Sequence, residues 1–158
     1  MGTRRHARET AMQALFCMDM SCAFTREMLD AYCRCFAPDE PQPPFFQHLV
    51  NGIIDHHDHI DGIIEQHSNN WKIRRMACVD RNILRLAVFE LLYCADIPAK
   101  VAINEAIDIG KKFGSPESGA FINGILDSIR LAIDQGRLLR RSAVTEARAT
   151  APKAVNGG

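Results

Sequence analysis

VDRNILRLAVFELLYCADIPAKVAINEAIDIGKKFGSPESGAFINGILD, residues 79–127, is the stretch that decides the fold class of this chain. Its apolar residues recur every three or four positions, which is the period of an amphipathic helix. Pro98, Gly114 and Pro116 interrupt the pattern, because proline cannot continue a helix and glycine commonly ends one. We therefore predict three helices here, over about 79–95, over 98–113, and from Ser115 onward.

The rest of the chain has the same period, and no segment alternates apolar and polar residues as a strand would. The connector PDEPQPP, residues 38–44, is too rich in proline to continue a helix. Thr25 is a candidate N-cap, since its hydroxyl can accept a bond from the first helical turn. Further helices are predicted over about 4–20, 25–36, 44–57 and 58–67. The fold class is therefore all-α, with about seven helices in one domain over residues 1–139, and residues 140–158 form a basic tail that we expect to be disordered.

The composition is typical of a globular protein, with 47% hydrophobic and 24% charged residues and a net charge of zero. No run approaches the ~20 apolar residues of a membrane span, and the basic start lacks a signal-peptide cleavage site. We therefore expect a cytoplasmic protein that is not bound to a membrane. Residues 1–16 carry a net charge of +2 and residues 137–158 a net charge of +4, which leaves −6 between them. Basic ends on an acidic body can attract a polyanion.

No pattern in the sequence indicates a catalytic or metal centre. The chain has no phosphate-binding glycine loop, no nucleophile elbow and no zinc-protease helix motif. Cys33 and Cys35 lack a second pair at zinc-ligand spacing, and all six cysteines are expected to be reduced thiols. The histidines at 56, 57, 59 and 67 are expected to face water at a helix junction rather than to bind a metal. We therefore expect no enzymatic activity and no cofactor.

Several polar residues of the deciding stretch suggest structural roles. Asn104 is a poor residue for a helix interior, and it either hydrogen-bonds a neighbouring backbone or contacts a partner. Glu105 is expected to form an ion pair with Arg81 or Arg85 from the preceding helix. Gly124 weakens the last helix, which indicates that another helix approaches closely there.

The opening segment RRHARETAMQALF, residues 4–16, is the first candidate for a binding surface. Its apolar residues recur at helical spacing, so Arg4, Arg5 and Arg8 are expected to lie to the side of the buried face. Arginine suits phosphate groups because its planar guanidinium donates two parallel hydrogen bonds. Phe16 lies two turns beyond Arg8, where an aromatic ring can stack on an unpaired base. This segment predicts a site for single-stranded nucleic acid.

The two segments together resemble the NusB family of bacterial transcription antitermination factors. The opening matches the family's arginine-rich start followed by Ala-x-Gln-Ala-Leu-aromatic. The matching pieces of the second segment are, in order, Ile-Leu-Arg-Leu-Ala, Glu-Leu, Ile-Pro, Val-Ala-Ile-Asn-Glu-Ala, Lys-x-Phe-Gly and Phe-Ile-Asn-Gly-Ile-Leu-Asp. The resemblance covers residues 4 to about 130, and it is lowest between about 21 and 70.

The resemblance implies an all-helical fold of two packed lobes. It also implies binding of the boxA element in ribosomal RNA leader transcripts. The implied protein partner is NusE, which is also a protein of the small ribosomal subunit. The heterodimer on boxA is expected to help assemble an antitermination complex on RNA polymerase.

The resemblance also implies roles for individual residues. The arginines at 4, 5 and 8 match the basic opening and would contact RNA phosphates, and Phe16 stands where the family often has tyrosine, so stacking is retained without the hydroxyl. Glu117 and Phe121 match positions beside the opening helix that border the RNA surface, and Glu117 would tune binding by repulsion. Asp80 matches a position that faces NusE. His6 interrupts the arginine run and so weakens the basic patch.

Two alternatives remain open at the level of sequence. Some ribosomal RNA cytosine methyltransferases carry a similar helical domain at the N-terminus, followed by a much longer catalytic region. A homodimeric helical module, in which the dimer hides the RNA surface, is the second alternative.

Overall fold

The computed structural model describes residues 3–37, 42–69 and 71–141. These residues form seven α-helices and a short 3-10 turn, with no strand in the described ranges, which confirms the all-α prediction. The helices are α1 (Thr3–Met20), α2 (Arg26–Phe36), α3 (Pro44–Asp55), α4 (His57–Gln66), α5 (Cys78–Tyr93), α6 (Ala99–Phe113) and α7 (Ser118–Asp134), and the 3-10 turn is Ile73–Arg75.

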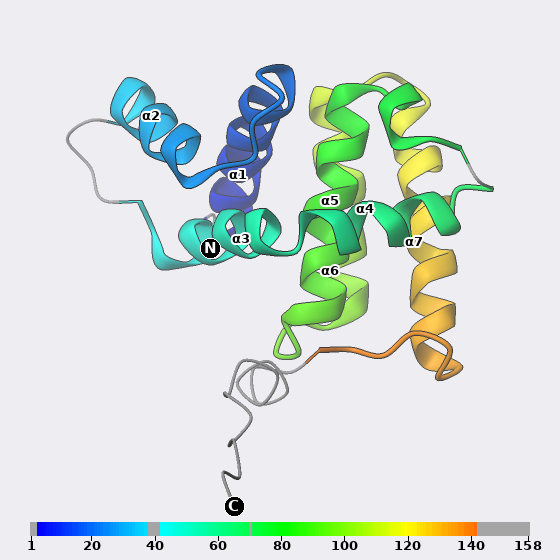
Figure 1. The fold of residues 1–158 in the computed structure, drawn as a ribbon. Helices are drawn as coiled ribbons and strands as arrows, with labels where there is room; N and C mark the ends of the chain where they lie inside the picture. Colours follow the sequence, from blue (N-terminus) through cyan, green and yellow to red (C-terminus); the bar gives the residue numbers. More distant parts are fainter. Residues whose placement is uncertain (1–2, 38–41, 70, 142–158) are drawn as a thin grey trace, which may run out of the picture.

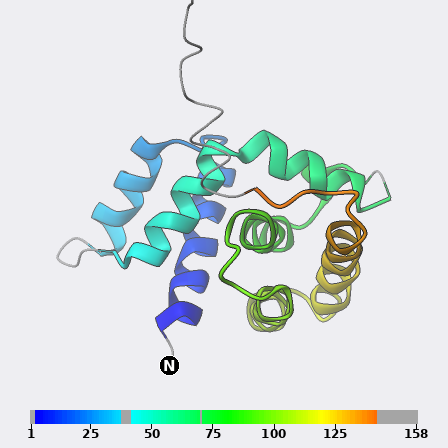
Figure 2. The ribbon, with the colours of Figure 1, turned by 90° about the horizontal axis from the view of Figure 1, so that it is seen from below.

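Helix α5 is the centre of the fold. It packs against α1 and α3 on one side and against α4, α6 and α7 on the other (Figure 1). Its residues from Asn82 to Leu92 are all buried, as expected for a helix surrounded by other helices. The view along α5 to α7 shows α1, α2 and α3 grouped on one side and α5, α6 and α7 on the other, with α4 crossing above them (Figure 2). Helix α5 therefore packs against helices of both groups, which correspond to the two predicted lobes.

Local sequence signals explain some of the helix ends. The Thr25 hydroxyl accepts a hydrogen bond from the backbone N–H of Met28 at 3.2 Å, which confirms the predicted N-cap. The prediction that the last helix begins at Ser115 is wrong, because α7 begins at Ser118. The Ser118 hydroxyl accepts the backbone N–H of Ser115 at 2.9 Å, so residues 115–117 form a turn closed by the first helical residue.

Close helix contacts occur at glycines other than the predicted one. A Cβ added to Gly52 would lie 2.2 Å from Cζ of Phe89, so α3 can approach α5 only with glycine at this position. A Cβ at Gly110 would lie 2.7 Å from Cδ1 of Ile122, where α6 meets α7. The predicted close approach at Gly124 is wrong, because no atom of another helix in the described ranges lies within 4 Å of a Cβ placed there.

The start of the predicted tail is bound to the end of α5. The Arg140 guanidinium donates to the carbonyl oxygen of Leu91 at 2.8 Å, and the backbone N–H of Arg141 donates to that of Leu92 at 2.7 Å. The prediction of a disordered tail otherwise concerns residues 142–158, which lie outside the described residues, as do residues 38–41 of the proline-rich connector.

The histidines at the α3–α4 junction pack against aromatic rings instead of facing water as predicted. The His56 ring stacks on Tyr93 at 4.3 Å between centroids, and the His57 ring lies 4.2 Å from that of Phe24. His67 shares a 2.9 Å hydrogen bond with the Ser128 hydroxyl. Within the described ranges no group of three or more potential ligands is placed to hold a metal ion, and no helix has the length and apolar character needed to cross a bilayer.

Candidate nucleic-acid interface

The exposed end of α1 carries the guanidinium of Arg4. Its side chain is 57% exposed, and its nearest carboxylate, that of Asp96, is 3.9 Å away. The guanidinium lies over the ring of Phe45, 4.9 Å from the centroid, which restricts its orientation without neutralising its charge. Arg4 is therefore accessible to an anion.

Arg5 is partly neutralised by α6. Its guanidinium donates to the carboxylates of Glu105 and Asp108, the latter at 2.9 Å. The hydrogen bond to Glu105 is the main reason that the pKa of Arg5 is raised above its ordinary value. The Arg5 side chain is still 38% exposed, so part of the guanidinium remains open to solvent.

Arg8 is buried, which contradicts the prediction that it lies to the side of the core face. Its Nε and Nη2 atoms donate to Oε1 of Glu90 in α5, at 2.9 and 2.6 Å, and the two side chains are only 4% and 2% exposed. Burial raises the pKa of Glu90, although the bonds from Arg8 oppose that rise. Arg8, Ala11 and Leu15 lie on one face at i, i+3 and i+7, and this spacing could have identified Arg8 as a core-facing residue.

The predicted pairing of Glu105 with Arg81 or Arg85 is also wrong. Arg81 donates to Asp19 in α1 at 2.8 Å through its Nη2 atom, and Arg85 donates to the same carboxylate at 2.8 Å. Burial alone would raise the pKa of Asp19, but the bonds from the two arginines outweigh it and lower that pKa to about 2. This buried network fixes the C-terminal end of α1 against α5, as Arg8 and Glu90 fix its N-terminal half.

Phe16 is partly exposed beside an apolar hollow of about 330 Å³. The hollow lies where α1 and α2 face the start of α5 and the end of α6, and Phe36, Val79 and Phe113 contribute to its walls. Phe36 is 69% exposed. An apolar hollow with a partly exposed aromatic ring can accommodate an apolar or planar group.

Asp80, Glu117 and Phe121 line a second hollow, of about 300 Å³, together with Trp71. The Trp71 ring is 53% exposed and meets the edge of the Phe121 ring at 6.0 Å between centroids. Oδ1 of Asp80 is buried and has no hydrogen-bond donor among the described residues. The sequence analysis did not identify Trp71 as a surface residue. Its position between polar residues in the sequence could have indicated that it is exposed.

The start of α7 does not lie beside α1, contrary to the implied arrangement. Both ribbon views show α5 and α6 between α1 and α7 (Figures 1 and 2). The two hollows approach one another at the start of α5, where Val79 lines the first and Asp80 the second. The candidate residues thus divide into a basic group at the start of α1 and an aromatic and acidic group near the start of α5.

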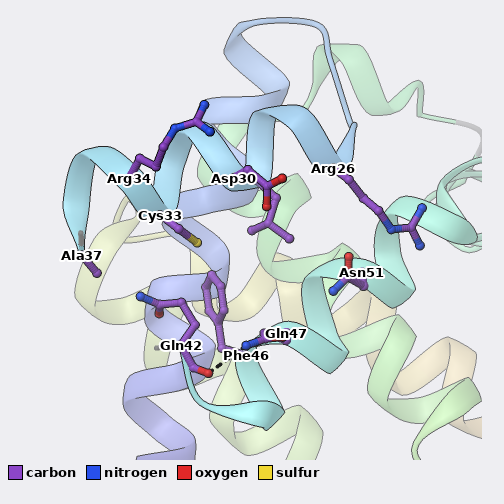
Figure 3. Close-up of a pocket in the computed structure, with 10 residues that line it drawn as sticks. Arg26, Asp30, Cys33, Arg34, Ala37, Gln42, Phe46, Gln47 and Asn51 are labelled. Atoms are coloured by element: carbon purple, nitrogen blue, oxygen red, sulfur yellow. Dashed lines mark hydrogen bonds between the residues drawn. The ribbon is translucent and has the colours of Figure 1, made fainter. Parts of the chain in front are cut away.

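A larger cavity of about 680 Å³ lies between α2 and α3 (Figure 3). Its charged residues are of both signs and all lie on α2, with Asp30 between Arg34 and Arg26. Burial raises the pKa of the Cys33 thiol in its wall, which disfavours the thiolate that a nucleophile requires.

The chain matches known proteins along most of its length. The model of the NusB family matches residues 5–130. A transcription antitermination protein NusB from Desulfatibacillum aliphaticivorans is 56% identical over 131 residues, 83% of this chain and 92% of the relative. The NusB protein of Bacillus subtilis (strain 168) is 44% identical over 132 residues, 84% of this chain and 98% of the relative.

Solved structures agree with the sequence comparison. A structure of T. maritima NusB superposes with a TM-score of 0.72 at 32% identity, covering 85% of this chain and 97% of the other. A crystal structure of the antitermination factors NusB and NusE in complex with dsRNA superposes with a TM-score of 0.69 at 29% identity, covering 84% and 98%. Sequence and fold lead to the same assignment: the chain belongs to the NusB family.

Proposed function

We propose that this protein is a transcription antitermination factor that binds boxA-type single-stranded RNA in ribosomal RNA leader transcripts together with NusE. Relatives at 44–56% identity are named transcription antitermination proteins, and a crystal structure of a similar NusB contains NusE and dsRNA. The observation on this chain that supports RNA binding most directly is the exposed cationic end of α1, formed by Arg4 and Arg5. The complex would assemble on RNA polymerase in the cytoplasm, without any catalytic step by this chain.

In this proposal the basic opening has two separate tasks. Arg4 and Arg5 contact RNA phosphates, because both guanidinium groups reach solvent. Arg8 does not contact the RNA. Its buried hydrogen bonds to Glu90 hold the first two turns of α1 in place against α5. A fixed helix presents the two exposed arginines at a constant spacing, which lowers the entropy lost on binding.

The aromatic residues supply the contacts that phosphate binding lacks. Phe16 is partly exposed, and we assign it to stacking on a base, which typically contributes about 1–3 kcal/mol for each stacked base. Phe121 and its neighbour Trp71 offer a second aromatic surface. Glu117 is exposed beside them and would repel phosphate, so it limits how closely the RNA backbone approaches α7.

Asp80 is the residue that we assign to the NusE contact. Its Oδ1 atom is buried at the edge of the hollow without a donor among the described residues. An unpaired buried carboxylate oxygen is costly, and turning of the Asp80 side chain toward a donor from a partner protein would remove that penalty. Because Asp80 and Phe121 line the same hollow, RNA and NusE would meet on this surface.

A titration of fluorescently labelled boxA RNA, with and without NusE, tests the proposal. We expect this protein alone to bind the RNA weakly and the mixture to bind it at least tenfold more tightly. A boxA sequence of scrambled order serves as the control and should bind less tightly to the mixture. Equal affinities with and without NusE would contradict joint binding. A protein that sediments as a dimer and shifts no RNA would instead favour the homodimeric module.

A further inference from the structure

The basic opening of α1 faces an acidic counterpart on α6. Asp108 accepts a hydrogen bond from Nη2 of Arg5 at 2.9 Å, and Glu105 accepts from Nε of the same guanidinium. One turn further along, Lys112 donates to Glu9 at 3.1 Å. The two helices are thus joined by ion pairs at the place where the proposed RNA surface begins.

The two carboxylates beside Arg5 differ in how tightly the fold holds them. Glu105 is 22% exposed and also lies 3.8 Å from Arg8, so it belongs to the interior network. Asp108 is 51% exposed, and its only ion pair among the described residues is with Arg5. An incoming anion can therefore replace Asp108 without disturbing the buried pair of Arg8 and Glu90.

We propose that Asp108 is the counterion that an RNA phosphate must displace from Arg5, and that it thereby limits both the affinity and the salt dependence of RNA binding. The inference rests on the proposed function, since it concerns the same basic surface. It adds a residue on α6 to a site that the sequence placed on α1.

The charge balance of this exchange gives a specific signature. A phosphate that binds a free guanidinium releases condensed cations from the RNA, and log affinity falls with log salt by about 0.7 for each such phosphate on a single strand. A phosphate that displaces Asp108 must break an ion pair that salt itself weakens by screening. Salt therefore weakens the competing contact together with the phosphate contact, so the contact at Arg5 contributes less to the salt slope while Asp108 is present.

The test compares Asp108→Asn with Asp127→Asn in RNA titrations over a series of salt concentrations. Asp127 is a matched control, because it is also about half exposed and ion-paired, but its partner Arg130 lies on α7, which α5 and α6 separate from α1. Both substitutions change the net charge by the same amount. Thermal unfolding of each variant confirms that the fold is retained.

We expect Asp108→Asn to tighten RNA binding about threefold, a gain consistent with release of an exposed ion pair. Its salt slope should become steeper by up to about 0.7, because the phosphate contact at Arg5 then no longer competes with an ion pair that salt weakens. Asp127→Asn should change neither quantity by a comparable amount. Adding Arg5→Ala should remove most of the gain from Asp108→Asn, because the displaced guanidinium is then missing.

The outcomes separate this inference from the proposed function. Wild-type protein that binds boxA RNA, together with equal effects of Asp108→Asn and Asp127→Asn, would overturn the role of Asp108 alone. A gain from Asp108→Asn that persists in the Arg5→Ala background would also overturn it. Wild-type protein that binds no RNA, with or without NusE, would overturn both.

Discussion

Replacing Arg8 by alanine should destabilise the whole fold rather than affect RNA contacts alone. The Arg8 guanidinium and the Glu90 carboxylate are joined by hydrogen bonds of 2.6–3.1 Å between side chains that are 4% and 2% exposed. Arg8→Ala would leave the Glu90 carboxylate in the interior without its main partner. A buried carboxylate of this kind must either stay charged at high energy or take up a proton.

The expected loss is large for a single residue. Removing one partner of a buried ion pair typically costs about 3–5 kcal/mol of unfolding free energy. For a chain of this size, that loss corresponds to a fall in melting temperature of roughly 6–20 °C. Arg4→Ala is the matched control, because Arg4 is 57% exposed and its carboxylate partner is 3.9 Å away. Such an exposed pair contributes less than about 1 kcal/mol.

Urea denaturation followed by circular dichroism measures both variants. A third variant, Arg8→Met with Glu90→Leu, removes both charges of the pair. Comparing it with Arg8→Ala separates the effect of losing the ion pair from the effect of leaving one buried charge unpaired. We expect the double substitution to recover most of the stability, because two well-packed apolar side chains leave no buried charge unpaired. If Arg8→Ala unfolded at the same urea concentration as Arg4→Ala, Arg8 would not anchor α1 and the division of tasks among the arginines would fail.

Three further predictions concern packing, pH and the second hollow. Gly52→Ala should lower the unfolding free energy by about 1–3 kcal/mol, because its Cβ would overlap the buried Phe89 ring; Gly124→Ala, in open space, should raise it by up to about 1 kcal/mol in the same denaturation assay. The pKa of Asp19 falls from 3.8 to about 2 on folding. Its carboxylate should therefore contribute about 2 kcal/mol of stability above pH 4 that is lost as the pH falls toward 2, and Asp19→Asn should show a smaller loss over that range. Trp71 is the only tryptophan in the sequence, and it lines the second hollow. Its fluorescence should therefore shift to shorter wavelength when NusE covers the hollow. An unchanged spectrum on NusE binding would show that this hollow is not part of the interface.

The sequence predicted the helices well because each is determined by local signals. The apolar period gave all seven helices, and the Thr25 cap was predicted from one hydroxyl at a helix start. The start of α7 was misplaced by three residues, because the Ser115-Pro116-Glu117 pattern is typical of a helix start, whereas residues 115–117 form a turn that the Ser118 hydroxyl closes. Glu117, which the pattern places in the first turn, is the N-cap residue of α7 and makes no capping hydrogen bond with its side chain.

The partners of charged residues were predicted poorly because they depend on tertiary contacts. Glu105 pairs with Arg5, a residue 100 positions earlier, and nothing in a single sequence relates the two. Arg8 is different: its register with Ala11 and Leu15 already placed it on the buried face. The general expectation that arginines are exposed outweighed that register, although a buried carboxylate on another helix can make such a residue part of the core.

The glycines show the same limit. Gly52 and Gly124 both lie in helices. Their local sequences do not show at which of the two glycines a second helix packs closely. Only Gly52 has an aromatic ring against its Cα, because α3 crosses α5 there. Close approach depends on how the helices pack. A sequence pattern indicates only that glycine lowers the stability of the helix at that position.

The measurement that tests the central claim most directly is the boxA affinity of Arg4→Ala/Arg5→Ala in the presence of NusE. The control is Arg26→Ala/Arg34→Ala, which removes the same charge from exposed positions on α2. We predict that the α1 variant binds about tenfold more weakly than wild type and that its salt slope becomes shallower by at least about 0.7, while the α2 variant binds nearly as wild type does. Equal losses in the two variants, or none in the first, would contradict the account.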